Sequence, residues 1–178
     1  VVIGCGPAGC SHVAVARARG ARVIVSQRSQ RRRELVERFA PEYVIDPYRD
    51  DVVARVRTLT QGRGADIVVC ANATAEAQTQ AVEMVRKGGH IILFGALPRG
   101  KSRVTVDANR IHYGEISVVG SHAFAPSMHA LALESIRRRL IPAERLITHT
   151  YPLEEIGEAF RMAASGKALK VAVTMGEG

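Results

Sequence analysis

Three glycines near the start of the chain constrain its fold more than any other feature. Gly4, Gly6 and Gly9 form a G-x-G-x-x-G pattern between the apolar run Val1–Ile3 and an apolar helical pattern that ends at Gly20. The first glycine of such a loop permits a tight turn, the second lets the backbone approach a pyrophosphate, and the third lets the helix pack close to the strand. The free N–H groups at the start of the helix favour a bound anion. The loop therefore predicts a dinucleotide site; a glycine turn without a ligand is the alternative.

The remainder of the chain alternates short β-type runs with helical segments, a pattern typical of parallel strands joined by helices. We expect strands at residues 1–4, 21–26, 43–46, 65–70, 90–94 and 115–119. We expect helices at residues 7–19, 29–39, 50–61, 74–85 and 126–139. The glycine-containing segment Lys87–Gly89 is expected to end the fourth of these helices. Six strands in this order predict an α/β, doubly wound, six-stranded parallel sheet of the Rossmann type, whose ligand crevice lies at the carboxyl ends of the strands.

The residues after position 141 do not continue this alternation cleanly. Strand-like runs at 146–151 and 169–174 flank a helical pattern at 154–164. We therefore divide the chain into a dinucleotide-binding domain at residues 1–141 and a C-terminal segment at residues 142–178 that leaves the sheet. Only three apolar residues precede the first glycine, whereas a strand usually has about five or six residues. We expect the chain to be a piece of a longer protein.

Composition argues against several other classes of protein. We expect no membrane association, because no apolar run approaches the roughly 18 residues of a membrane-spanning helix. Three cysteines without C-x-x-C spacing argue against a disulfide framework and against a metal cluster, so a reducing cytoplasm is the expected location. The net charge of +8 comes mostly from arginine. Nucleic-acid binding is one explanation, but aromatic residues make up only 4%, which favours an anionic cofactor or solvated helix faces.

Several further blocks follow the glycine loop in a fixed order. They are Gly62–Asp66, Val85–Gly89, Phe94–Gly100, Ile111–Ile116, Leu146–His149, Pro152–Leu153 and Ser165–Lys167. Together with the loop, this set resembles the zinc-type medium-chain dehydrogenases, the superfamily of alcohol, sorbitol and threonine dehydrogenases. The blocks at 111–116 and 146–149 resemble its sorbitol, threonine and polyol branch.

The resemblance implies a function for the whole protein and a place for this chain in it. The implied reaction is hydride transfer between NAD(P) and a secondary alcohol, polyol or ketone, and the implied assembly is a homo-oligomer, a dimer or a tetramer. The C-terminal segment would return toward a catalytic domain outside this chain. That domain would hold the zinc, because Cys5, Cys10 and Cys70 match no ligand position. We therefore expect no catalytic or metal-binding residue here, and cofactor binding without turnover.

The resemblance also implies a set of cofactor contacts. Backbone groups of the Pro7–Ala8 region, with the three glycines, would face the pyrophosphate. Ala71, Asn72 and Ala73 would border the adenosine. Gly95, Ala96 and the backbone near Val119 would border the nicotinamide.

The residues after the second strand bear on the choice between NAD and NADP. NAD-preferring relatives have an aspartate there, about 20 residues beyond the glycines, that holds the ribose hydroxyls. This chain has Ser26-Gln27-Arg28 instead. Gln27 has no charge to repel a 2′-phosphate, and Arg28 with Arg32 would clamp one through charge-assisted hydrogen bonds. We therefore predict NADP(H) over NAD(H); the alternative is that Gln27 binds the ribose and the arginines are solvated.

Three other functions are compatible with parts of the sequence. A flavoprotein also begins with G-x-G-P-A-G but would have an acidic residue where Gln27 stands. A zinc-free quinone reductase usually has a different loop, Gly-Ala-x-Gly-Gly-Val-Gly. A nucleotide-sensing or nucleic-acid-binding module is the alternative from a different class. We interpret His12, His112 and His149 as structural, and we expect Cys5 to pack in the core even though the adjacent helix N-terminus favours a lowered thiol pKa.

Overall fold

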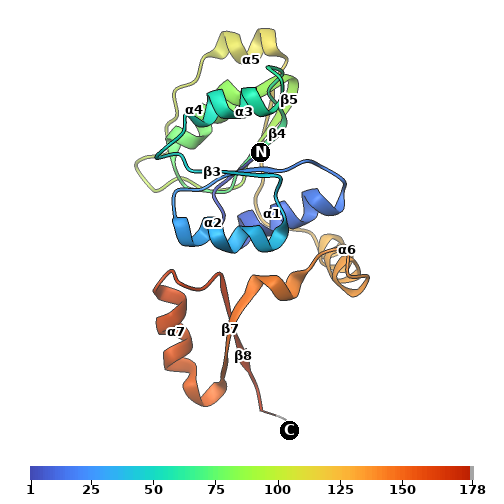
Figure 1. Cartoon of the computed structure of the whole chain (residues 1–178), viewed down its shortest axis with the longest axis vertical. Helices are drawn as coiled ribbons and strands as arrows, with labels where there is room; N and C mark the ends of the chain where they lie inside the picture. Colours follow the sequence, from blue (N-terminus) through green and yellow to red (C-terminus); the bar gives the residue numbers. More distant parts are fainter. Residues whose placement is uncertain (177–178) are drawn as a thin grey trace.

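The computed structural model describes residues 1–176 and contains the predicted Rossmann sheet (Figure 1). Its strands run in the order β3-β2-β1-β4-β5-β6, and every neighbouring pair is parallel. Their bounds are β1 Val2–Ile3, β2 Ile24–Ser26, β3 Tyr43–Ile45, β4 Ala65–Cys70, β5 Val85–Leu93 and β6 Ser117–Gly120. The order reverses between β1 and β4, which is where a doubly wound sheet opens its ligand crevice.

Helices cover both faces of the sheet and create two apolar clusters. These helices are α1 Pro7–Ala18, α2 Gln30–Val36, α3 Val52–Leu59 and α4 Ala75–Met84, whereas α6 Pro126–Arg137 buries none of its residues. One cluster includes Val13 of α1 and Val36 of α2, and the other includes Val56 of α3 and Met84 of α4, all four fully buried. The central strands β1 and β2 are buried along their whole length, which explains their continuous apolar runs, whereas the edge strand β6 is exposed.

Side-chain caps begin three of these helices. Ser29 accepts a hydrogen bond from the backbone N–H of Arg32, and Thr74 accepts one from that of Ala77. Asp51 caps α3 in the same way. Each cap satisfies a backbone donor that the helix itself leaves free. The caps also set where the loops after β2, β3 and β4 end, and these loops form the candidate site.

Two segments around β5 and β6 differ from the sequence-based expectation. The segment Val85–Gly89 does not end a helix: α4 stops at Met84, and β5 starts at Val85, which pairs with Ala65 of β4. A register shift between Ala65 and Ile67 accommodates these extra strand residues. An unpredicted helix, α5 Ala108–Gly114, precedes β6. It ends at Glu115 in the left-handed conformation (φ 52°), so β6 begins at Ser117 rather than at residue 115.

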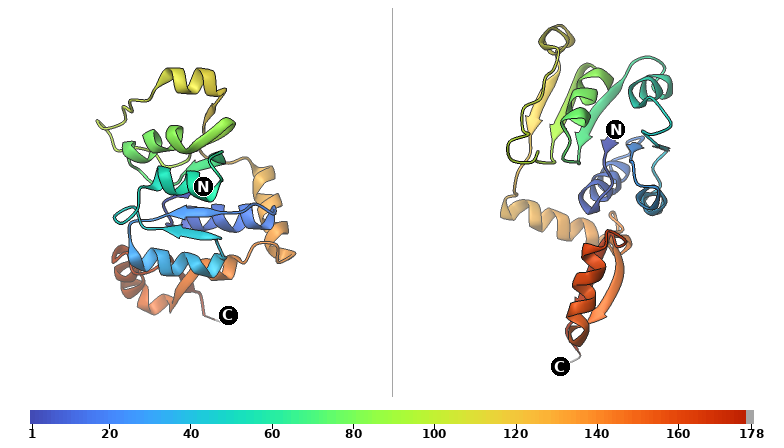
Figure 2. Two further views of the ribbon diagram at one scale, coloured as in Figure 1. Left: turned by 45° about the horizontal axis from the view of Figure 1, so that its top comes forward. Right: turned by 90° about the vertical axis from the view of Figure 1, so that its left-hand side faces the viewer.

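The C-terminal segment has the expected strand, helix and strand and leaves the large sheet, but it continues the βα alternation more regularly than expected. Strand β7 Ile147–Pro152, helix α7 Ile156–Ala164 and strand β8 Lys170–Thr174 form a βαβ unit with its own parallel two-stranded sheet. Figures 1 and 2 show this unit set apart from the large sheet, at the end of the molecule beyond α6. Residues 177 and 178 of the expected segment lie outside the described residues.

Few contacts attach this unit to the large domain. The guanidinium of Arg31 donates to the carbonyl of Lys167, and that of Arg145 donates to the carbonyl of Arg38. Leu169 is buried in the apolar cluster that contains α1 and α2, whereas Val171 and Val173 of β8 are only half-buried. Only part of the apolar surface of the unit is therefore covered. Among residues 1–176, no helix has the length and apolar character required to cross a bilayer.

Candidate functional site

The glycine loop connects β1 to α1 through two close backbone approaches. Gly4 has a φ of +92°, and a Cβ there would lie 2.8 Å from the Cβ of Asn72. A Cβ on Gly9 would lie 1.9 Å from the carbonyl oxygen of Gly4, so only glycine lets α1 start this close to the strand. A Cβ on Gly6 would meet nothing closer than a guanidinium nitrogen of Arg32, at 3.6 Å. Gly4 and Gly9 thus shape the loop, while Gly6 leaves open space above it.

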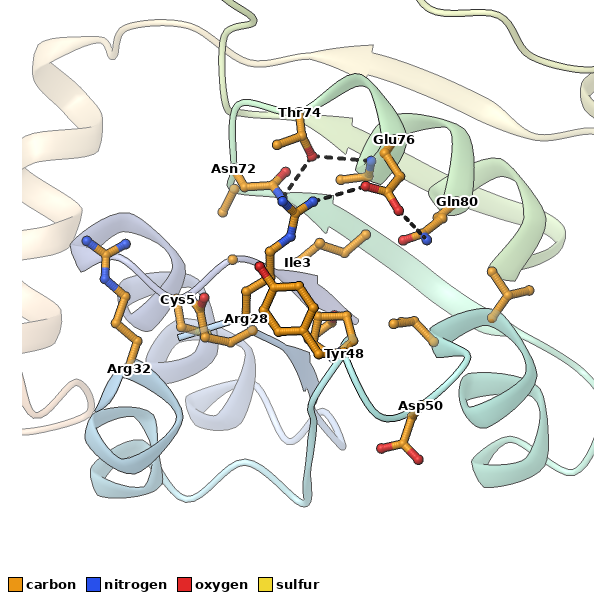
Figure 3. A pocket seen from close by; sticks show the side chains of 18 of the residues that line it. Ile3, Cys5, Arg28, Arg32, Tyr48, Asp50, Asn72, Thr74, Glu76 and Gln80 are labelled. Atoms are coloured by element: carbon orange, nitrogen blue, oxygen red, sulfur yellow. Dashed lines mark hydrogen bonds and ion pairs between the residues drawn. The ribbon is translucent and has the colours of Figure 1, made fainter. Parts of the chain in front are cut away.

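A cavity of about 1000 Å³ lies against this loop at the carboxyl ends of the strands (Figure 3). The loops after β1, β2, β3 and β4 and the first turns of α3 and α4 form its walls. Nine of the predicted cofactor residues line it: Gly4, Gly6, Ser26, Gln27, Arg28, Arg32, Ala71, Asn72 and Ala73. These nine residues therefore come together in one place, whereas Pro7, Ala8 and Gly9, also predicted near the pyrophosphate, do not line the cavity.

The residues expected near the nicotinamide lie outside this cavity. Gly95 adjoins it from the end of β5: its N–H donates to the carbonyl of Cys70, and a Cβ would lie 2.1 Å from the carbonyl oxygen of Asn72. Ala96 is exposed, and Val119 on the edge strand β6 is 49% exposed. These three residues continue the same edge of the sheet, since β5 and β6 follow β4. Their contact with a nicotinamide stays a prediction.

The loop after β2 is held by a side chain that the sequence analysis did not single out. Arg33 forms an ion pair with Asp46 at the end of β3, with Nη2 2.8 Å from Oδ2, and its Nη1 donates to the carbonyls of Gln27 and Arg28. The Gln27 side chain is 8% exposed, and its Oε1 accepts a hydrogen bond from the N–H of Ser29. The sequence did not indicate this role, because Arg33 lies in a run of arginines and composition cannot distinguish a side chain held in an ion pair from a solvated one.

Arg28 and Arg32 face different parts of the cavity. The Nη2 of Arg28 lies 3.0 Å from Oε2 of Glu76 on α4, across the cavity from its own strand (Figure 3). Arg32 lies beside the glycine loop, near Gly6. The expected clamp, in which both guanidinium groups hold one phosphate, is therefore not assembled in this arrangement. The loop and Arg32 suit one anionic group, and Arg28 suits a second.

Asn72 supplies a buried polar atom without a hydrogen-bonding partner among the described residues. Its Nδ2 donates to Oγ1 of Thr74 at 3.3 Å, but no donor reaches its Oδ1. An unpaired buried carbonyl costs about 1–3 kcal/mol. Asn72 lines the cavity, but its Oδ1 has almost no exposed surface, so a ligand would reach this atom only after the side chain turned. The cavity itself offers glycine backbone and guanidinium groups, which suit phosphates.

The site has no evident reactive nucleophile or metal centre. Cys5, Cys10 and Cys70 are free and fully buried. A hydrogen bond with the Cys10 thiol and burial raise the pKa of Cys5, and burial raises that of Cys70 to about 11. Cys5 thus packs in the core as we expected. Within residues 1–176, no three His, Cys, Asp or Glu side chains lie close enough together to hold a metal ion.

Comparison with known proteins assigns this site to a family. Residues 7–138 match the family model for zinc-binding dehydrogenases. The chain is 32% identical to the sorbitol dehydrogenase of Halalkalibacterium halodurans over 98% of its length, and 34% identical to the L-threonine 3-dehydrogenase of Pyrococcus horikoshii over 96%. A solved structure from Sinorhizobium meliloti 1021, described as a zinc-binding dehydrogenase bound to NADP, superimposes with a TM-score of 0.86 at 28% identity, covering 98% of this chain and 51% of that one.

The chain belongs to the zinc-binding dehydrogenase family and carries the nucleotide-binding domain of the zinc-type medium-chain superfamily. It spans about half the length of the curated relatives it matches, 51% of the sorbitol dehydrogenase and 49% of the threonine dehydrogenase. The matches favour this family over the flavoprotein, zinc-free reductase and nucleic-acid-binding alternatives.

Proposed function

We propose that this chain binds the nicotinamide dinucleotide for a zinc-dependent alcohol or polyol dehydrogenase. The observation that carries the proposal is the cavity in which the glycine loop, Arg32, Arg28 and Asn72 converge at the reversal of strand order. Such a crevice receives dinucleotides in doubly wound sheets. The sorbitol and threonine dehydrogenases among the relatives support an alcohol or polyol substrate.

The residues present would hold the cofactor in a defined direction. The glycine loop and the start of α1 would bind the pyrophosphate, and Ala71, Asn72 and Ala73 would border the adenosine. Gly95, Ala96 and Val119 would border the nicotinamide, which supplies or accepts the hydride when bound. Zinc and substrate would be held by residues outside this chain. We expect cofactor binding without turnover, and zinc-dependent alcohol oxidation by this chain alone would contradict that expectation.

We propose NADP(H) rather than NAD(H) as the preferred cofactor. Gln27 leaves the end of β2 without the carboxylate that would repel a 2′-phosphate, and Arg28 places a guanidinium beside it. The NADP in the Sinorhizobium meliloti structure supports the proposal.

Direct titration tests the proposal. NADPH and NADH are each added to the purified chain, and binding is followed by the fluorescence of the reduced nicotinamide. We expect both to bind, with NADPH the tighter. Tighter NADH binding would overturn the preference, and no binding of either nucleotide would overturn the proposed function.

Three broader expectations accompany this function. We propose a division near residue 141, which is supported by the separate sheet of β7 and β8. A dimer or tetramer is supported by the exposed apolar residues Val118 and Val119 on the edge strand β6 and can be checked by light scattering. A cytoplasmic location fits three free cysteines.

A further inference from the structure

We propose that Glu76 sets how strongly this site discriminates NADPH from NADH, by competing with the 2′-phosphate for Arg28. The inference rests on the proposed dinucleotide function and names a specificity residue on α4 that lies opposite the usual position at the end of β2. The observation behind it is the ion pair that joins the two sides of the cavity.

The position of Glu76 lets its carboxylate compete with a phosphate for the guanidinium of Arg28. It lies in the first turn of α4, and both it and Arg28 line the cavity. Its Oε2 is 3.0 Å from Nη2 of Arg28, and its Oε1 accepts a hydrogen bond from Nε2 of Gln80 at 3.5 Å. The carboxylate thus occupies the side of the Arg28 guanidinium that faces α4 (Figure 3).

The exposure of the pair indicates that an anionic ligand can break it. The Arg28 side chain is 46% exposed and that of Glu76 is 66% exposed. Exposed ion pairs contribute little net stability because both ions are solvated when they separate. A phosphate monoester carries about −1.5 to −2 charge near neutral pH and forms stronger, charge-assisted hydrogen bonds with arginine. A 2′-phosphate can therefore take Arg28 from Glu76, but the released carboxylate then lies close to the phosphate.

Charge along the cavity wall leads to the same expectation. Four acidic residues line the cavity, Asp50, Asp51, Glu76 and Glu83, against the two basic residues Arg28 and Arg32. Asp51 caps α3, and Glu83 pairs with Arg110. Glu76 is the acidic residue of this set that contacts a predicted phosphate-binding side chain. Removing its charge should therefore favour the nucleotide with the extra phosphate.

The test compares the wild type with Glu76→Gln. Glutamine keeps the length of the side chain and the ability to accept a hydrogen bond from Arg28, while it removes the charge. NADPH and NADH are titrated into each protein, and 2′,5′-ADP and 5′-AMP are titrated separately to isolate the adenosine end. We expect the ratio of NADPH to NADH affinity to rise about fivefold, with a similar rise for 2′,5′-ADP over 5′-AMP.

A matched control is Glu42→Gln, which removes the acidic partner of Arg22 in another exposed ion pair away from this cavity. It should leave the ratio unchanged. If both nucleotides still bind to Glu76→Gln but the affinity ratio is unchanged, the inference is overturned. A lower ratio would also overturn it, because it would mean that Glu76 holds Arg28 in place for the phosphate. Absence of binding of both nucleotides in the wild type would overturn the proposed function and this inference with it.

Discussion

Arg33 and Asp46 tie together the ends of two adjacent strands beneath the cavity. Their side chains are only 19% and 16% exposed, and the same guanidinium also donates to the carbonyls of Gln27 and Arg28. One arginine thereby fixes the backbone from which the predicted specificity residues project. Arginine reaches the acid and the two carbonyls from two nitrogens held in one plane, whereas all three donors of a lysine lie on a single nitrogen.

Replacing Arg33 should therefore weaken both the fold and the site. We expect Arg33→Met to lower the free energy of unfolding by about 2 kcal/mol, because it leaves Asp46 without its closest cation in a mostly buried position. Urea unfolding measures this effect, and nucleotide affinity should fall as well. Arg49→Ala is the control, since Arg49 is 85% exposed and lies 3.8 Å from the same carboxylate. It should cost less than about 0.5 kcal/mol; equal losses in the two variants would contradict the role of Arg33.

The separate positions of Arg28 and Arg32 predict different binding phenotypes. Arg28→Gln should lower NADPH affinity about tenfold and leave NADH affinity within about twofold, because we propose that Arg28 binds the 2′-phosphate, which NADH lacks. Arg32→Gln should weaken both nucleotides alike, since Arg32 lies beside the glycine loop. Fluorescence titration of each variant distinguishes these outcomes. Equal selectivity changes in the two variants would instead support a shared clamp on one phosphate.

Gly9→Ala should remove nucleotide binding and destabilise the fold by more than about 2 kcal/mol. The added Cβ would lie 1.9 Å from the carbonyl oxygen of Gly4, so the strand or the helix must move. Gly157→Ala in α7 is the matched control, because a Cβ there meets only the end of Arg161, at 3.9 Å. That change should stabilise the protein by up to about 1 kcal/mol through helix propensity. A Gly9→Ala variant as stable as the wild type would be inconsistent with the close approach.

We expect His12 to make stability dependent on pH. Its ring packs edge-to-face against Phe94 at 4.6 Å, and burial lowers its pKa from the ordinary value of 6.5. Below that value the unfolded chain binds a proton that the folded protein resists, so stability should fall as the pH drops below about 6.5. His12→Phe keeps an aromatic ring against Phe94 and should reduce this loss. Urea unfolding of both proteins at pH 8 and pH 5.5 provides the comparison, and identical pH dependence would argue against His12 as the source.

The buried thiols should be unreactive in the folded protein. Cys5, Cys10 and Cys70 are fully buried, so a reagent does not reach them in the folded protein. The pKa is raised for Cys5 and Cys70, whereas the hydrogen bond with Cys5 lowers the pKa of Cys10, so the protection of Cys10 rests on burial alone. We expect a disulfide reagent such as dithionitrobenzoate to modify none of them within minutes at pH 8, and all three in denaturant. Rapid labelling of one native thiol would show that the glycine loop opens. Labelling of a Cys5→Ser variant would then identify the residue.

Local patterns were sufficient to predict the large sheet and the glycine loop. The close approach of Gly9 to Gly4 involves only the neighbouring strand and helix, and apolar runs such as Ala65–Cys70 have the composition of parallel strands. The start of β5 at Val85 was missed, because Val85 pairs with Ala65 across a register shift that no periodicity reveals.

Contacts between distant residues account for the other differences. The parallel pairing of β7 with β8 depends on which strand lies nearby, not on either sequence alone, so the C-terminal unit was not predicted as a sheet. Likewise, nothing in the run of arginines distinguishes the roles of Arg33 and Arg28. In the structure Arg33 pairs with Asp46, and Arg28 pairs with Glu76. The site was therefore predictable as a location, but the partners of its charged side chains were not.

The tight approaches at Gly9 and Gly95 also determine where the protein can change during evolution. A side chain at either position would collide with a backbone oxygen, at 1.9 Å and 2.1 Å respectively, so few substitutions there can survive selection. Arg28 and Glu76 carry no such restriction, because both are substantially exposed. If the proposed cofactor site is right, a lineage can exchange one nucleotide for the other through a few changes at positions such as 28 and 76, while the closely packed glycine positions are inherited unaltered.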